Sequence, residues 1–153
     1  MNFYLLPTLE FGPLVVRRLL HQIPASRLDE ALVEGRFTPR EVIAHLADWE
    51  PILRERIEAA RTEPGTVIQV WDEGQMALDH GYARTDPEEQ CALFIRERSL
   101  TAALVRGLAA EDWGKTVQHP ERGVQSVDDM ANLILGHDLY HIEQLSAFLP
   151  EQM

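Results

Sequence analysis

Hydrophobic side chains recur three and four residues apart along four long stretches of the chain, and polar side chains fill the positions between them. This period places the apolar side chains on one face of an α-helix. The stretches cover about residues 3–22, 38–63, 86–108 and 126–148. Four amphipathic helices in one short chain predict an all-α protein that folds as a four-helix bundle.

Two of the helix starts carry the signature of a capping box. Thr38 precedes Pro39 and is followed three residues later by Glu41, and Ser126 is followed in the same way by Asp129. The hydroxyl accepts a free N–H of the first turn, and the acid reaches back to the start of the helix. Proline fits the first helical position, where its missing N–H does no harm. These signals place the starts of the second and fourth helices.

Three residues interrupt the helical stretches. Gly12 and Pro13 predict that the first helix is kinked or starts late, and Pro51 predicts a bend in the second. Proline has this effect because it lacks the N–H that bonds to the carbonyl one turn earlier.

The connection between the second and third helices, residues 63–85, is long for a bundle. It can cross the whole bundle, which would allow the two helices to run parallel, and it can cover a pocket. Residues 72–80 within it predict a short helix. Residues 67–70, VIQV, predict at most a brief extended segment, so we expect no β-sheet.

The chain has 153 residues, which suit a single domain spanning 1–153. Its formal net charge of −11 repels phosphate backbones and anionic lipids, which argues against nucleic-acid and membrane partners. With Cys91 as its one cysteine, the chain forms no internal disulfide. The first residues lack the pattern of a signal peptide, and no stretch reaches the about 18–20 apolar residues of a membrane span. We therefore expect a cytoplasmic protein.

Two histidines and an aspartate fall on the inward side of the fourth predicted helix. His137 and His141 are four residues apart and share one helix face, which Asp138 also approaches. On the second helix, His45 lies at the edge of the apolar stripe beside Trp49. Three such histidines suit a metal site with an open position, whereas a lone inward histidine is more often a hydrogen-bonded core residue. The spacing leaves both interpretations open, and the glutamate of the H-E-x-x-H motif is absent.

Three carboxylates are candidates for proton transfer at such a site, namely Asp48 on the second helix, Asp72 in the long connection and Asp138. Each also has a structural interpretation, which we favour for Asp48 and Asp72. Asp48 would then lie on a solvated helix face and Asp72 in a turn. Asp138 would orient a metal-bound histidine without touching the metal itself.

Other reactive or charged side chains have simpler explanations. Arg96 and Arg98 on the third helix could hold an anionic group of a substrate, but we expect both on the surface. Cys91 follows Glu88 and Glu89, which oppose formation of a thiolate, so we expect it to be buried or inert.

Two segments, FTPREVIAHLADWE (37–50) and HPERGVQSVDDMANLILGHDLYHIEQL (119–145), resemble the DinB/YfiT-like superfamily. The resemblance rests on the order of the motifs. A His-Leu pair at His45 comes first, an H-P-x-x-G turn at His119 follows, and an H-D-x-x-H motif at His137 ends in Gln-Leu. It extends over essentially the whole chain.

The resemblance implies an up-down-down-up four-helix bundle with a long crossover between the second and third helices, often as a homodimer. It also implies a divalent transition metal held by His45, His137 and His141. Zinc and nickel are the expected metals, with iron or manganese as further options. It implies no contact with DNA.

The resemblance also implies a set of activities on small molecules. Some members of the superfamily resemble thiol-dependent S-transferases that use bacillithiol or mycothiol, and relatives include a thiol-dependent maleylpyruvate isomerase. We therefore expect a thiol-dependent S-transferase acting with a low-molecular-weight thiol. A metal-dependent hydrolase and a non-enzymatic, stress-associated bundle that binds a metal or a partner are the alternatives.

Overall fold

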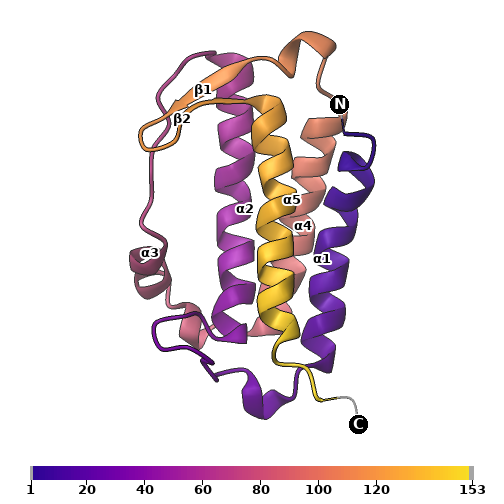
Figure 1. The fold of residues 1–153 in the computed structure, drawn as a ribbon, viewed down its shortest axis with the longest axis vertical. Helices are drawn as coiled ribbons and strands as arrows, with labels where there is room; N and C mark the ends of the chain where they lie inside the picture. Colours follow the sequence, from indigo (N-terminus) through magenta and orange to yellow (C-terminus); the bar gives the residue numbers. More distant parts are fainter. Residues whose placement is uncertain (1, 152–153) are drawn as a thin grey trace.

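Four long helices lie side by side in the computed structural model, which describes residues 2–151 (Figure 1). They are α1 (Leu5–Gln22), α2 (Pro39–Thr62), α4 (Pro87–Arg106) and α5 (Val127–Ser146). Shorter elements connect them: η1 (Ala25–Arg27), α3 (Glu73–Asp79), η2 (Tyr82–Arg84), η3 (Ala110–Asp112), β1 (Thr116–His119) and β2 (Gly123–Ser126). The prediction of an all-α four-helix bundle is confirmed.

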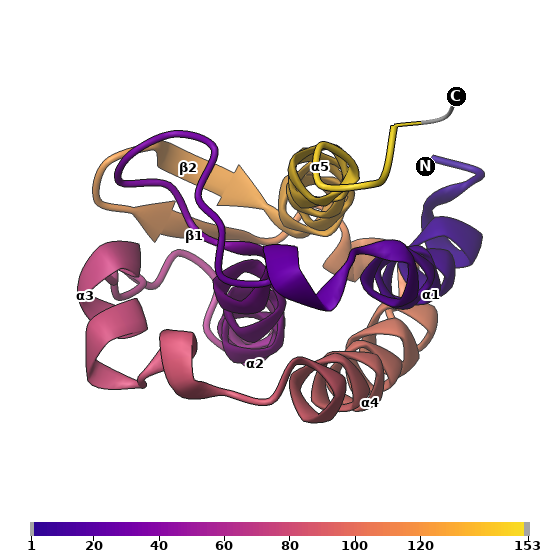
Figure 2. The same cartoon turned by 90° about the horizontal axis from the view of Figure 1, so that it is seen from below.

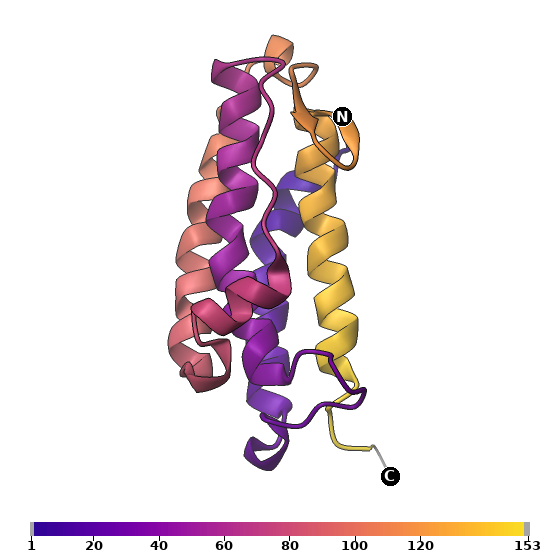
Figure 3. The same cartoon turned by 90° about the vertical axis from the view of Figure 1, so that its left-hand side faces the viewer.

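The helices follow the up-down-down-up order. In Figure 1, α1 and α5 run from top to bottom, whereas α2 and α4 run from bottom to top. Because α2 and α4 are parallel, the chain between them has to return along the full length of the bundle. Figure 3 shows this return beside α2, and α3 is the short helix predicted within it.

The capping signals act as predicted. The Thr38 hydroxyl accepts the backbone N–H of Glu41 at 3.3 Å, and the Ser126 hydroxyl accepts that of Asp129 at 3.0 Å. In both cases the acid side chain accepts the backbone N–H of the capping residue, which completes the capping box. These caps fix where α2 and α5 begin, and both helices carry histidines of the candidate site.

The first helix does not start late, because Gly12 and Pro13 lie inside α1. Pro13 lacks the N–H that would bond to the carbonyl of Leu9 in an unbroken helix. Arg98 of α4 supplies the missing donor, since its Nη1 donates to that carbonyl at 3.0 Å. A tertiary contact therefore compensates for the proline. In the second helix, α2 also continues as a single helix through Pro51.

The expectation of no β-sheet is wrong. Strands β1 and β2 pair antiparallel, with Thr116 opposite Ser126 and His119 opposite Gly123. Val67 adds a single parallel bridge to Gln118. Strands of four residues are too short to show a clear alternating pattern, which is why the sequence does not predict them. Figure 2 shows that this hairpin and α3 lie outside α2 and α5, away from α1 and α4.

The core has two apolar parts with a charged layer between them. Near the start of α5, Leu9, Ile57 and Ile134 belong to one cluster, and near its end Phe94 and Leu145 belong to the other. At the intermediate level the four helices contribute Gly12, Glu50, Arg98 and Asp138, and the three charged side chains are buried. The prediction that Arg98 lies on the surface is therefore wrong, whereas Arg96 is exposed.

None of the helices within residues 2–151 is both long and apolar enough to cross a lipid bilayer.

Candidate metal centre

Three histidine rings from two helices meet at one point. His45 lies on α2, and His137 and His141 lie one turn apart on α5. The Nε2 atom of His137 is 3.0 Å from Nε2 of His45 and 3.2 Å from Nε2 of His141. One ligand atom from each residue lies within 4.8 Å of the other two. Among residues 2–151 no acid or cysteine joins this cluster.

His45 and His141 are buried and His137 is partly buried, and burial keeps the three imidazoles neutral. His45 is fully buried, and burial together with the neighbouring histidines lowers its pKa to about 2. Burial, assisted by His141, Arg98 and Arg122, lowers the pKa of His137 to about 3. The pKa of His141 is also lowered by burial. Neutral imidazole is the form of histidine that binds a metal, so these side chains need not lose a proton to do so at neutral pH.

The nitrogen positions fit a metal ion better than a network of hydrogen bonds. Ligands about 2.0–2.1 Å from a tetrahedral zinc ion are about 3.3 Å apart, close to the 3.0 and 3.2 Å that separate Nε2 of His137 from the Nε2 atoms of His45 and His141. Gln144 Oε1 lies 3.0 Å from Nδ1 of His141 and accepts its proton, which leaves a lone pair on Nε2 of that ring. Each neutral ring carries one proton, so the three converging nitrogens cannot all be satisfied by one another.

Aromatic rings surround the histidine closest to the core. The ring of His45 lies 5.4 Å from that of Phe37, 5.7 Å from that of Trp49 and 6.5 Å from that of Tyr82, measured between centroids. The Nδ1 atom of His45 is buried without a hydrogen-bond partner among the described residues. This side of the site therefore excludes water and holds the ring by packing alone.

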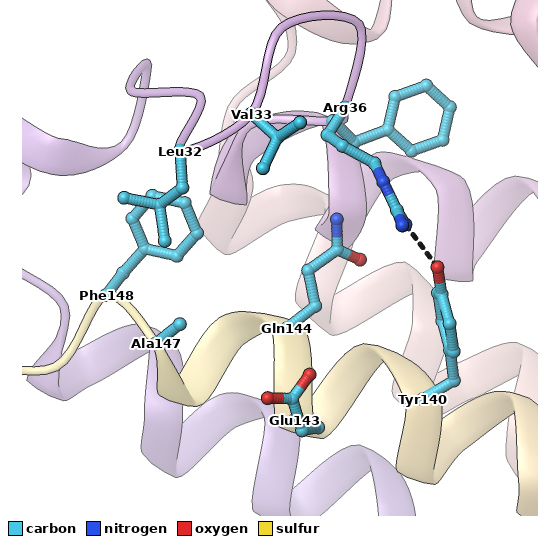
Figure 4. A pocket seen from close by; sticks show the side chains of 9 residues that line it. Leu32, Val33, Arg36, Tyr140, Glu143, Gln144, Ala147 and Phe148 are labelled. Atoms are coloured by element: carbon cyan, nitrogen blue, oxygen red, sulfur yellow. Dashed lines mark hydrogen bonds between the residues drawn. The ribbon is translucent and has the colours of Figure 1, made fainter.

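Two cavities approach the cluster from opposite ends. A cavity of about 360 Å³ is lined by His137 and extends toward the β-hairpin. A second cavity, of about 240 Å³, lies between the loop before α2 and the end of α5 (Figure 4). The amide of Gln144 points into the second cavity, and Arg36 donates a hydrogen bond to the Tyr140 hydroxyl across it. A small molecule can thus reach the neighbourhood of His137 from one side and of Gln144 from the other.

Asp138 accepts hydrogen bonds from Arg98 rather than from His137. Arg98 donates Nη1 and Nη2 to Asp138 at 2.6 and 2.7 Å, and it donates Nε and Nη2 to Glu50 at 2.6 and 2.9 Å. Burial raises the pKa of the Asp138 carboxyl despite its bonds to Arg98, because a single guanidinium serves two buried carboxylates. Asp138 anchors the turn of α5 that carries His137, and it is not bonded to either ring nitrogen of that histidine.

The other two carboxylates lie apart from the histidines. Asp48 accepts hydrogen bonds from Tyr82 Oη and His80 Nδ1, both at 2.6 Å, and so ties α2 to the returning chain. Asp72 caps α3 by accepting the backbone N–H of Gln75 at 2.7 Å. Neither has a hydrogen bond to the cluster in the described part of the chain, so the structure gives both a structural use.

Cys91 is buried, as expected. Burial and the nearby Glu88 raise the pKa of its thiol to about 11, which keeps it protonated at neutral pH.

Glu50 and Gln144 were missed from the sequence and Arg98 was placed on the surface, although helical phase carries a signal for each of them. Glu50 lies four residues after the buried Leu46, and Arg98 lies four residues after the buried Phe94. A charged residue in phase with an apolar stripe points inward, where it requires a partner. Gln144 offers a weaker signal, because it lies three residues after His141, where a side chain on the same helix can reach the ring.

Comparisons with known proteins agree with this architecture. The model of the DinB superfamily matches residues 8–145. A curated protein of Oceanobacillus iheyensis, provisionally named a metal-dependent hydrolase, is 27% identical over 135 residues, covering 88% of this chain and 78% of its own. YfiT of Bacillus subtilis, which has a similar provisional name, is 24% identical over 139 residues, covering 90% and 78% respectively.

Solved structures share the fold. The structure of Bacillus subtilis YfiT, described as a probable metal-dependent hydrolase with an unusual four-helix bundle topology, matches with a TM-score of 0.88 at 23% identity. That match covers 94% of this chain and 83% of YfiT. A mycothiol-dependent maleylpyruvate isomerase matches with a TM-score of 0.74 at 19% identity, over 92% of this chain and 59% of the isomerase. With its family model, its YfiT-like bundle and its motifs in agreement, the chain belongs to the DinB superfamily.

Proposed function

We propose that His45, His137 and His141 bind one divalent transition metal and that the protein is a metal-dependent enzyme acting on a small molecule. The convergence of the three Nε2 atoms beside an accessible cavity is the observation that carries this proposal. Imidazole ligands suit zinc and nickel, and also iron, whereas manganese prefers oxygen ligands. Zinc or nickel is therefore the metal we expect.

A metal held by three histidines, with a further position open, supplies Lewis acidity and lowers the pKa of a bound water or thiol. The chain itself fixes the ligands. Gln144 holds the His141 ring by accepting its Nδ1 proton, and Phe37 and Trp49 pack around His45. The cavity next to His137 places a substrate beside the cluster.

Within this class we propose a thiol-dependent S-transferase. Asp48, Asp72 and Asp138 are all hydrogen-bonded elsewhere, so none is poised to take a proton from a nucleophile at the cluster. A thiol, with an ordinary pKa of about 8.5, needs less help to ionise than water with its pKa of 15.7. The shared fold with a mycothiol-dependent isomerase supports the same choice.

Metal-loaded protein without an affinity tag tests this activity. It would be incubated with monochlorobimane and, separately, with bacillithiol, mycothiol, glutathione or cysteine, and the conjugate would be measured by fluorescence. We expect metal-dependent conjugation of at least one thiol, and its loss in His141→Ala. Turnover of esters or amides without any thiol would instead identify a hydrolase. Absence of turnover in both assays, with a metal bound, would favour a non-enzymatic role.

A further inference from the structure

Basic side chains gather in the cavity beside His137. Arg56 from α2, Arg122 from the turn of the hairpin and His119 from β1 all line this cavity of about 360 Å³. The returning chain contributes Trp71 to the same wall. The cavity is thus lined both by a histidine of the candidate metal centre and by two arginines.

Neither arginine has an acidic partner among the residues the structure describes. Arg56 donates Nη2 to the backbone carbonyl of Gln69 at 3.1 Å, but its Nε is buried without any acceptor. Its guanidinium lies 5.8 Å from the ring centre of Trp49, whose own Nε1 is also buried and unbonded. The chain holds 25 acids against 14 lysines and arginines, so two unpaired arginines in one cavity are not explained by a shortage of acids.

The charges in this cavity repel one another. Burial and the proximity of Arg122 lower the pKa of Arg56, and the pKa of His119 is lowered by burial and by both arginines. Keeping like charges together in a half-buried site is unfavourable unless something of opposite charge joins them. Glu73 and Glu121 also line the cavity, but neither forms an ion pair with an arginine there.

His119 adds a neutral donor. Its Nδ1 accepts the backbone N–H groups of Glu121 at 3.1 Å and Arg122 at 3.2 Å. In the neutral ring the proton therefore resides on Nε2. Two guanidinium groups and an imidazole N–H are the donors that a planar carboxylate accepts.

We propose that this cavity binds the carboxylate of a small-molecule substrate through Arg56 and Arg122, with the reacting end of the molecule toward His137. The role of this subsite in a reaction rests on the proposed function, but the binding of a carboxylate there requires no metal. We expect a carboxylate to bind more tightly than phosphate, because Glu73 and Glu121 in the same wall disfavour two negative charges on one centre, whereas each end of a dicarboxylate carries only one.

Binding to metal-free protein separates this inference from the metal centre. The metal is first stripped with a chelator, and the chelator is then removed by dialysis because common chelators are themselves carboxylates. Quenching of tryptophan fluorescence is then followed during titration with succinate, with its neutral analogue succinamide and with inorganic phosphate. We expect saturable quenching by succinate, at least about tenfold weaker binding of succinamide, and weaker binding of phosphate than of succinate.

Three arginine variants complete the test. Arg56→Gln and Arg122→Gln should each weaken succinate binding by about tenfold or more, whereas Arg96→Gln, at an exposed position of α4, should not. Arg122 is exposed, so its variant remains informative even if Arg56→Gln unfolds. Zinc uptake, measured in parallel, should be unchanged in all three. Equal binding of succinate and succinamide, tighter binding of phosphate, or unchanged affinity in both cavity variants would overturn the inference. Failure of zinc uptake alone would contradict the proposed function and leave the subsite standing.

Discussion

At the scale of single residues, the site depends on which nitrogen of each imidazole carries the proton. His141 presents Nε2 to the cluster because its Nδ1 is bonded to Gln144. His45 has no such partner and is held by the aromatic rings around it. Hydrogen-bonded ligands are better oriented than free ones, so Gln144 acts as a positioning residue for His141.

Replacement of Gln144 tests this positioning role. Gln144→Leu removes the acceptor for Nδ1 of His141, and we expect metal affinity to fall about 10- to 100-fold. Gln144→Glu keeps an acceptor at the same position and should retain the affinity or increase it. Isothermal titration with zinc measures both. Equal affinities of the two variants would show that the hydrogen bond does not orient the ligand.

The low pKa values of the histidines predict how the metal-free protein responds to acid. The unfolded chain binds a proton on each histidine below pH about 6.5, whereas the folded cluster stays neutral down to pH about 2 to 3 at His45 and His137. The contribution of these neutral histidines to the stability of the folded state is therefore complete above pH about 6.5, and it is lost as the pH falls toward their folded-state pKa values.

Between pH 7 and pH 5 this loss amounts to about 2 kcal/mol of unfolding free energy for each such histidine. Urea unfolding at the two pH values measures it. His45→Gln removes one of these groups and should reduce the dependence by about that amount. The same pH dependence in the variant and the wild type would show that His45 is not held neutral.

Four-residue spacing and inward phase indicated His137 and His141 as candidates, and a place at the edge of an apolar stripe indicated His45; the three side chains lie together in the structure. Arg98 was misplaced because an isolated arginine on a helix is normally solvated. Its burial depends on Glu50 and Asp138, which lie on two other helices. Charged partners that meet across helices are not visible along a single helix.

At the scale of elements, α1 fits the bundle because it lacks a side chain at one position. A Cβ atom on Gly12 would lie 2.2 Å from Oδ2 of Asp138 and 3.2 Å from Nη1 of Arg98. Pro13 then frees the Leu9 carbonyl for Arg98. The Gly-Pro pair, which as a local signal indicates a break, therefore makes room for the ion pair and supplies it with an acceptor.

Gly12→Ala tests this arrangement against the intrinsic helix preference of alanine. We expect a loss of about 2 kcal/mol or more in unfolding free energy, because the new methyl group displaces a buried ion pair. Gly136→Ala is the matched control, since Gly136 is exposed within α5 and a Cβ atom there would meet no atom within 4 Å beyond its chain neighbours and the backbone of its own helix. That variant should gain up to about 1 kcal/mol. Urea titration compares them, and a neutral Gly12→Ala would contradict the packing described.

The elements themselves were predictable to different degrees. Helices with a capping box at Thr38 or Ser126 begin where the sequence placed them. Strands β1 and β2 were not predicted, because each has only four residues and shows no clear alternating pattern of its own.

At the scale of the whole molecule, the charged layer divides the core, and α2 packs directly against α5 so that their histidines meet. The outer face of α1 and α5 carries exposed apolar side chains, including Tyr4, Phe11 and Leu139. A contiguous apolar surface of this kind is typical of a contact with another protein.

We expect the chain to form a homodimer through the α1–α5 face. Light scattering coupled to size exclusion should give twice the chain mass of 17.4 kDa. Leu139→Lys should shift the protein to a monomer, because it places a charge within the apolar face. Leu100→Lys is the control, as it changes an exposed leucine on α4 and should leave the dimer intact. A wild-type monomer would contradict this expectation.

The metal content of the purified protein tests the three-histidine centre most directly. Tag-free protein would be stripped, reconstituted separately with zinc and nickel, dialysed, and measured by inductively coupled plasma mass spectrometry. We predict one metal ion per chain in the wild type and in His21→Ala, which alters an exposed histidine outside the cluster. We predict loss of that ion in His45→Ala, His137→Ala and His141→Ala. Wild-type protein without metal, or full occupancy in all three cluster variants, would contradict the account.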